Sequence, residues 1–114
     1  MSVSASFVTF VTEQLSRAGG SIRTRKMFGG VGIYASDLFF ALIDDDVVYF
    51  KVDDATRPGF EARAMGPFMP SGDEGEVMQY YQVPADVLED VEELRPWMEA
   101  AVEVARRKRT RKVK

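Results

Sequence analysis

The sequence predicts a two-layer α+β domain, with an antiparallel sheet of about five strands flanked by N- and C-terminal helices. Apolar residues recur at helical spacing near the N-terminus and again after residue 85. Between them, aromatic and β-branched runs with short connections indicate antiparallel strands. A length of 114 residues with 46% hydrophobic composition fits one folded domain.

The first predicted element is a helix that begins after Ser2 or Ser4, either of which can cap it through the side-chain hydroxyl. Gly19-Gly20 should end it, because glycine readily adopts the left-handed backbone that follows a helix. The apolar stripe of this helix consists of Phe7, Phe10, Val11, Leu15 and Ala18.

Four strands are expected within residues 22–52. The last two are separated by Asp44-Asp45-Asp46, a composition typical of a turn. In the fourth strand, Val48, Phe50 and Val52 share one face and should point into the core. The expected strands are 22–28, 31–34, 38–43 and 47–52.

The rest of the chain predicts a short helix over 55–64, capped by Asp53 or Asp54, and a strand over 78–83. A brief strand could also form at 67–69 within a loop rich in glycine and proline. Helices follow from Ala85, with a break near Asp90, because Asp90 and Glu93 have the spacing of a capping box. Pro96 should kink the last helix or mark its restart.

The sequence contains no cysteine and no histidine. This composition excludes disulfides, thiol nucleophiles, Cys/His zinc sites and catalytic triads that need an imidazole. We therefore expect no catalytic residues, no metal and no cofactor. The N-terminus lacks the pattern of a signal peptide, and the apolar runs are too short to span a bilayer, which predicts a cytoplasmic protein.

The positive charges are concentrated at the C-terminal end of the chain. Seven of the 15 Lys and Arg residues lie within 106–114, so the preceding residues carry 8 basic against 18 acidic side chains. We expect a domain over 1–109 and a basic tail over 110–114. The charges could form a solvated helix end, contact nucleic acid or contact an acidic surface. The residues are Arg106, Arg107, Lys108, Arg109, Arg111, Lys112 and Lys114.

Three other clusters are candidate binding sites. Gly29, Gly30 and Gly32 suit a tight hairpin or bulge better than a phosphate loop, because no Gly-Lys-Ser/Thr follows. The three adjacent aspartates could ligate Mg²⁺ or Ca²⁺, but a solvated turn explains them more simply. A sheet face could also stack nucleic-acid bases, although strand aromatics usually form the core. Its residues would be Tyr34, Tyr49, Tyr80 and Tyr81 with Arg25, Lys26 and Lys51.

Several motifs in this order resemble the TfoX/Sxy N-terminal domain family. The first is Arg25-Lys26-Met27-Phe28-Gly29-Gly30-Val31-Gly32-Ile33-Tyr34. The others are Phe40-Ala41-Leu42-Ile43, Tyr49-Phe50-Lys51-Val52-Asp53, Arg57-Pro58, Phe60-Glu61, Pro67-Phe68, Met78, Tyr80-Tyr81, Val83-Pro84 and Leu94-x-x-Trp97. The resemblance covers about residues 5–109 and implies a secretion-chaperone-like fold. The best-known members are non-enzymatic regulators of natural competence that act as coactivators beside a cAMP-dependent transcription activator.

The sequence and the resemblance together predict a non-enzymatic regulatory or protein-interaction module, for which the transcription machinery is one expected partner. The alternative is a nucleic-acid-associated accessory protein that binds through the basic tail; an undetected enzyme is a third possibility. The expected partner-binding patch is the main basic cluster outside the tail, which an acidic partner segment would fit. It comprises Arg25, Lys26, Phe28, Gly29, Gly30 and Lys51.

Overall fold

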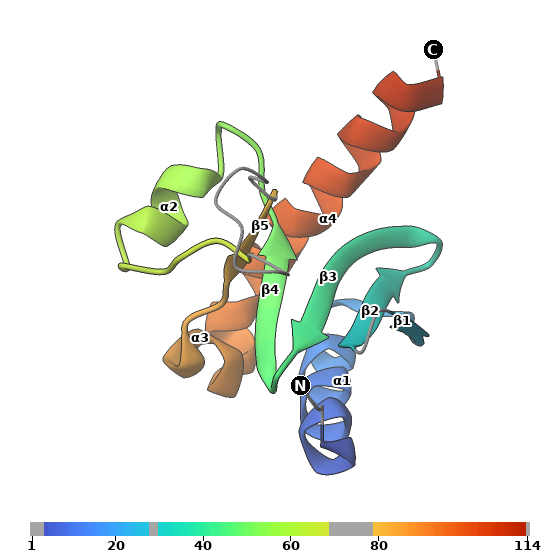
Figure 1. Ribbon diagram of the computed structural model, residues 1–114, viewed down its shortest axis with the longest axis vertical. Helices are drawn as coiled ribbons and strands as arrows, with labels where there is room; N and C mark the ends of the chain where they lie inside the picture. The colour runs from blue at the N-terminus through green and yellow to red at the C-terminus, as the bar shows by residue number, and fades with distance from the viewer. Residues whose placement is uncertain (1–3, 28–29, 69–78, 114) are drawn as a thin grey trace.

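A computed structural model describes residues 4–27, 30–68 and 79–113, arranged as Figure 1 shows. Its strands form one antiparallel sheet in the order β1-β2-β3-β4-β5. The predicted α+β class with an antiparallel five-stranded sheet is therefore confirmed. The strands are β1 (Ile22–Met27), β2 (Gly30–Ala35), β3 (Leu38–Asp44), β4 (Val47–Lys51) and β5 (Tyr80–Gln82). The helices are α1 (Ala5–Gly19), α2 (Arg57–Glu61), α3 (Ala85–Glu89) and α4 (Val91–Val113).

The core lies between one face of the sheet and the helices α1, α3 and α4 (Figure 1). Val48, Phe50 and Val52 are at most 2% exposed, as the alternation in this strand predicted. The last helix supplies the opposing stripe, and burying these side chains is the main favourable term in folding. The largest fully buried side chains are Phe40, Phe50, Leu15, Ile33, Ile43, Leu94, Met98, Val11, Val52, Val87 and Val104.

Helix α1 begins and ends where the sequence predicted. The Ser4 hydroxyl accepts a hydrogen bond from the Phe7 amide (3.3 Å), and Gly20 follows the helix with φ 119°. The predicted apolar stripe was wrong at Phe10, which is 38% exposed and contacts the Phe7 ring instead of the core. Gln14 takes a buried position and donates a hydrogen bond to the Leu88 carbonyl (3.0 Å).

A register shift between β2 and β3 explains why consecutive residues of β3 are buried. Ile33 pairs with Ala41, whereas Tyr34 pairs with Phe39, so that Phe40 is the extra residue of a bulge. Phe40 and Ala41 are both fully buried, and Phe39 stacks on Tyr34 on the opposite face of the sheet.

The structure differs from the predictions after residue 52. The helix predicted over 55–64 is only Arg57–Glu61. Thr56, and not Asp53 or Asp54, is its N-cap residue, and the positive φ of Ala64 prevents the helix from reaching residue 64. The strand predicted over 78–83 is reduced to Tyr80–Gln82 among the described residues, and Met78 lies outside them. At 67–69 there is an isolated bridge between Pro67 and Tyr81, and Met69 again lies outside.

The helix break near Asp90 is confirmed. Asp90 Oδ1 accepts hydrogen bonds from the amides of Glu92 (3.0 Å) and Glu93 (3.3 Å), which caps α4. Helix α4 then runs through Pro96 without restarting and continues to Val113. The residues expected to form a tail are thus helical through Val113 and extend α4 away from the sheet (Figure 1).

Candidate functional site

The structure distributes the predicted partner-binding patch over different parts of the sheet. Arg25 and Lys26 lie on the edge strand β1, whereas Lys51 lies on β4, with β2 and β3 between them. At the usual strand spacing their backbones are about 14 Å apart. Lys26 pairs with Val31, whose side chain faces the helices, so Lys26 and Arg25 also point to opposite faces. Gly30 begins β2, and Phe28 and Gly29 lie outside the described residues.

The basic residues after Ala105 lie on the last turns of α4. Arg106 pairs with Glu103 of the same helix (2.5 Å), and Arg107 reaches across to Asp53 (2.5 Å), so acidic side chains of the domain neutralise part of this charge. Arg109, Arg111 and Lys112 follow on the same helix, although their side chains lie outside the described set, as does the whole of Lys114.

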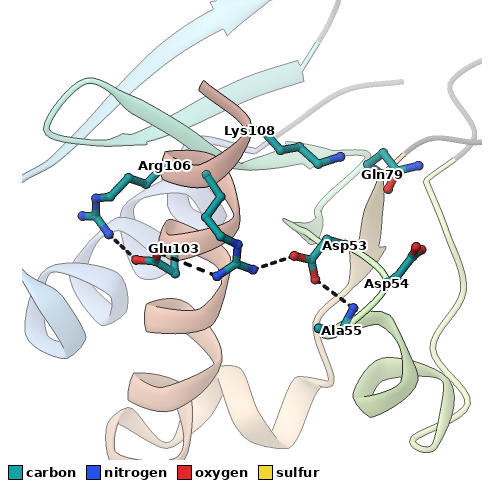
Figure 2. Close-up of a pocket in the computed structure, with 8 residues that line it drawn as sticks. Asp53, Asp54, Ala55, Gln79, Glu103, Arg106 and Lys108 are labelled. Carbon is teal, nitrogen blue, oxygen red and sulfur yellow. Dashed lines mark hydrogen bonds and ion pairs between the residues drawn. The ribbon is translucent and has the colours of Figure 1, made fainter. Parts of the chain in front are cut away.

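A charged cleft of about 850 Å³ lies between these turns of α4 and the segment that follows β4. An ion pair between Arg107 and Asp53 spans it. Figure 2 shows Lys108 and Gln79 at one side of the cleft and Arg106 turned to the other side of the helix. Its lining residues are Asp53, Asp54, Ala55, Gln79, Glu103, Arg106, Arg107 and Lys108.

Asp53 organises the wall of this cleft opposite α4. Its Oδ1 accepts hydrogen bonds from the amides of Ala55 (3.1 Å) and Thr56 (3.0 Å), while Oδ2 accepts from Arg107. Burial acts to raise the pKa of Asp53, but the hydrogen bonds and the positive charge of Arg107 together hold this pKa below its ordinary value. Asp53 thus tethers α4 to the chain ahead of α2.

Replacing Arg107 with glutamine should raise the pKa of Asp53 toward its ordinary value, as measured by NMR titration of the carboxyl carbon. A lowered folded pKa stabilises the protein above the ordinary carboxylate range, and this stability is lost as the pH falls through the folded pKa. The variant should therefore lose less stability on acidification than the native protein. The difference in stability will be small because the Arg107 side chain is half exposed.

The matched control is Arg106→Gln, which removes a neighbouring charge whose partner is Glu103. It should leave the pKa of Asp53 unchanged. An equal rise in both variants would show that the general charge of the helix, and not the Arg107 contact, depresses the pKa.

An apolar hollow of about 300 Å³ adjoins the charged cleft, and Ala55 lines both. It lies between α2 and α4, where the rings of Phe60 and Trp97 meet edge to face with centroids 4.7 Å apart. Phe60 is buried, whereas Trp97 is only half-buried, so the indole contributes an accessible apolar wall. We call the hollow and the cleft together the α2–α4 groove.

The sequence analysis did not find this groove. Asp53 and Arg107 are 54 positions apart, and Trp97 was identified only as part of the motif Leu94-x-x-Trp97. The available signal was the Asp53-x-x-Thr56 spacing, which is typical of side chains that order a turn.

Residues 13–105 match the family model of the TfoX N-terminal domain. The chain belongs to this family. The match runs from within α1 to Ala105, immediately before the basic residues of α4, and includes Trp97 and Asp53. A comparison with curated proteins gives no match.

Two further observations concern the residues that the structure describes. No helix among them is long and apolar enough to cross a membrane. No three acidic side chains in that part of the chain come close enough together to hold a metal ion, including those of the Asp44–Asp46 turn.

Proposed function

We propose that this chain is a non-enzymatic regulatory module that acts by binding a segment of another protein in the α2–α4 groove. Membership of the TfoX N-terminal domain family supports a competence-regulator-like domain. The observation that carries the proposal is the apolar hollow at Trp97, which directly adjoins a cleft lined by charged side chains.

The chemistry of the groove favours a particular kind of partner segment. A bulky apolar side chain would fill the hollow between Phe60 and Trp97, and such buried anchors supply most of the affinity of protein interfaces. A neighbouring carboxylate would meet Lys108, which lies at the edge of the cleft (Figure 2). A regulatory protein needs no further chemistry than this recognition.

Replacing Ala100 with arginine should reduce capture of the partner by more than about tenfold, because loss of a buried anchor site removes at least about 1.4 kcal/mol. Ala100 lines the hollow, so a long side chain there fills it. The measurement is affinity capture from extract of the source cells with the native chain and the variant as baits, quantified by mass spectrometry.

The control is Ser16→Arg on the exposed surface of α1, which introduces the same side chain away from the groove. It should capture the partner as the native chain does. Equal capture by Ala100→Arg and the native chain would refute the groove as the docking site. Capture that nuclease treatment abolishes would instead favour the alternative, an accessory protein that binds nucleic acid through the basic end of α4.

A further inference from the structure

The face of the sheet opposite the helices carries an aromatic row that runs across the strands. The Tyr34 and Phe39 rings stack with centroids 5.2 Å apart, and the Tyr80 ring follows 5.8 Å from Phe39. Lys51 Nζ lies over the Phe39 and Tyr80 rings, at 5.8 Å and 5.1 Å from their centroids. At the β1 edge the Arg23 guanidinium lies 5.2 Å from the Tyr34 centroid. This row forms the cationic end of the face.

The other end of the same face is acidic. Asp44 pairs with Val47 across the β3–β4 hairpin, and its Oδ1 lies 3.6 Å from the position that a Cβ would take at Gly30. Burial and, to a smaller extent, the charges of Asp44 and Asp45 raise the pKa of Tyr49, which is consistent with carboxylates beside this ring. Asp46 turns toward α1 instead, where it accepts a hydrogen bond from the Ser4 amide (2.8 Å).

Between its cationic and acidic ends, the face is apolar. Leu42 pairs with Tyr49 across β3 and β4, and both side chains are half-buried. Gly32 extends this line onto β2 without a side chain, and Phe68 packs on the Tyr49 ring (4.9 Å). Tyr80, at the cationic end, is 7% exposed, whereas Leu42 and Tyr49 are only half-buried. Half-buried apolar side chains on a sheet face opposite the helices are suited to packing against a second sheet.

The positive and negative positions of this face lie at equal distances on either side of Tyr49. Along β4, Lys51 lies two residues beyond Tyr49, and Val47, the partner of Asp44, lies two residues before it. Two copies can pack these faces together around a two-fold axis that lies between them, perpendicular to the strands and close to Leu42 and Tyr49. In this arrangement β3 and β4 of one copy lie antiparallel over β3 and β4 of the other. Lys51 of each copy then lies over the Asp44–Val47 pair of the other, so one surface supplies both halves of two identical contacts.

We propose that this face of the sheet binds a second copy of this chain, through a two-fold interface centred on Leu42 and Tyr49 and closed by Lys51–Asp44 ion pairs. The alternation of charge favours this occupant over an acidic peptide or a single-stranded nucleic acid, which would meet Asp44 and Asp45 at one end. Strands of five to seven residues in β2, β3 and β4 give a contact near or below the standard of about 800 Å² per partner. The dimer is therefore reversible, and monomers prevail when the protein is dilute.

Charge exchange tests the proposal, with sedimentation velocity from low micromolar to near-millimolar concentration as the measurement. The native chain should dimerise, and Lys51→Glu and Asp44→Lys should each raise the dissociation constant by about tenfold or more, since each places like charges together. An equimolar mixture of the two variants should form a heterodimer within about threefold of the native affinity, because opposite charges face each other again. This rescue also shows that both variants are folded.

The controls are Lys26→Glu and Asp54→Lys, exposed positions outside the interface, which should dimerise as the native chain does. Ala100→Arg should also dimerise normally, so failure of the groove and failure of this interface are distinguishable. A native chain that stays monomeric throughout the range overturns the proposal, as does a lack of rescue in the mixture. Binding of polyglutamate or oligothymidylate that Lys51→Glu abolishes, without any dimer, would assign the face to an acidic ligand and overturn it as well.

Discussion

Replacing Phe50 with alanine should lower the free energy of unfolding by about 3–5 kcal/mol, the range observed when a buried phenylalanine is truncated. Phe50 is fully buried on β4 and packs on Phe40 with ring centroids 5.7 Å apart. Phe40 is held by the bulge between β2 and β3, and Ala41, the direct neighbour of Phe50, is also fully buried. The surroundings therefore have little freedom to collapse into the cavity. Urea unfolding followed by circular dichroism measures the change.

Phe10→Ala provides the matched control, because it removes the same ring from a site that is 38% exposed. It should cost clearly less than Phe50→Ala, since part of the Phe10 ring is already exposed to water, its surroundings can relax, and alanine favours the helix. If the two substitutions cost the same, the sheet would not be the centre of the core.

The sequence was sufficient to predict the strands because their side chains alternate between a buried and an open face. Val48, Phe50 and Val52 can all be buried only when their face of the strand points into the core. The Asp44–Asp46 run between the two strands indicates a turn. The first helix and the break at Asp90 were equally predictable, because capping is determined by residues a few positions apart.

Features that depend on distant parts of the chain were not predictable in this way. The alternation of β1 and β4 contains no information on which strands lie between them, so Arg25 and Lys51 were grouped although the sheet order separates them. The bulge at Phe40 moves Phe39 to the open face, which a regular two-residue period would not anticipate. The helix predicted over 55–64 was too long, since local propensity could not show that it begins only after Thr56 or that Ala64 has positive φ.

The candidate site depends on the same kind of distant pairing. The groove exists because Asp53, after β4, and Arg107, near the end of α4, meet in space. The basic residues after Ala105 were identified as a charge run, but the sequence could not show that Arg106 and Arg107 are ion-paired. The positions of these partners follow from how α4 packs across the sheet.

Replacing Gly30 with alanine should lower the free energy of unfolding by about 1–3 kcal/mol, although it adds only one methyl group. A Cβ at Gly30 would lie 2.4 Å from the backbone carbonyl oxygen of Ile43, a distance that requires something to move. Ile43 is fully buried in β3 and bonded into the sheet, so its carbonyl cannot shift without disturbing the β2–β3 register. Urea unfolding of the variant gives the cost directly.

Gly59→Ala is the control that separates this close approach from the general effect of losing a glycine. Gly59 lies in α2 with nothing within 4 Å of its would-be Cβ, so alanine there should be neutral or stabilising by up to about 1 kcal/mol. Equal stability of the two variants would show that the start of β2 adapts. A loss confined to Gly30→Ala would establish that glycine is needed where β2 approaches β3, a requirement that hairpin composition alone does not reveal.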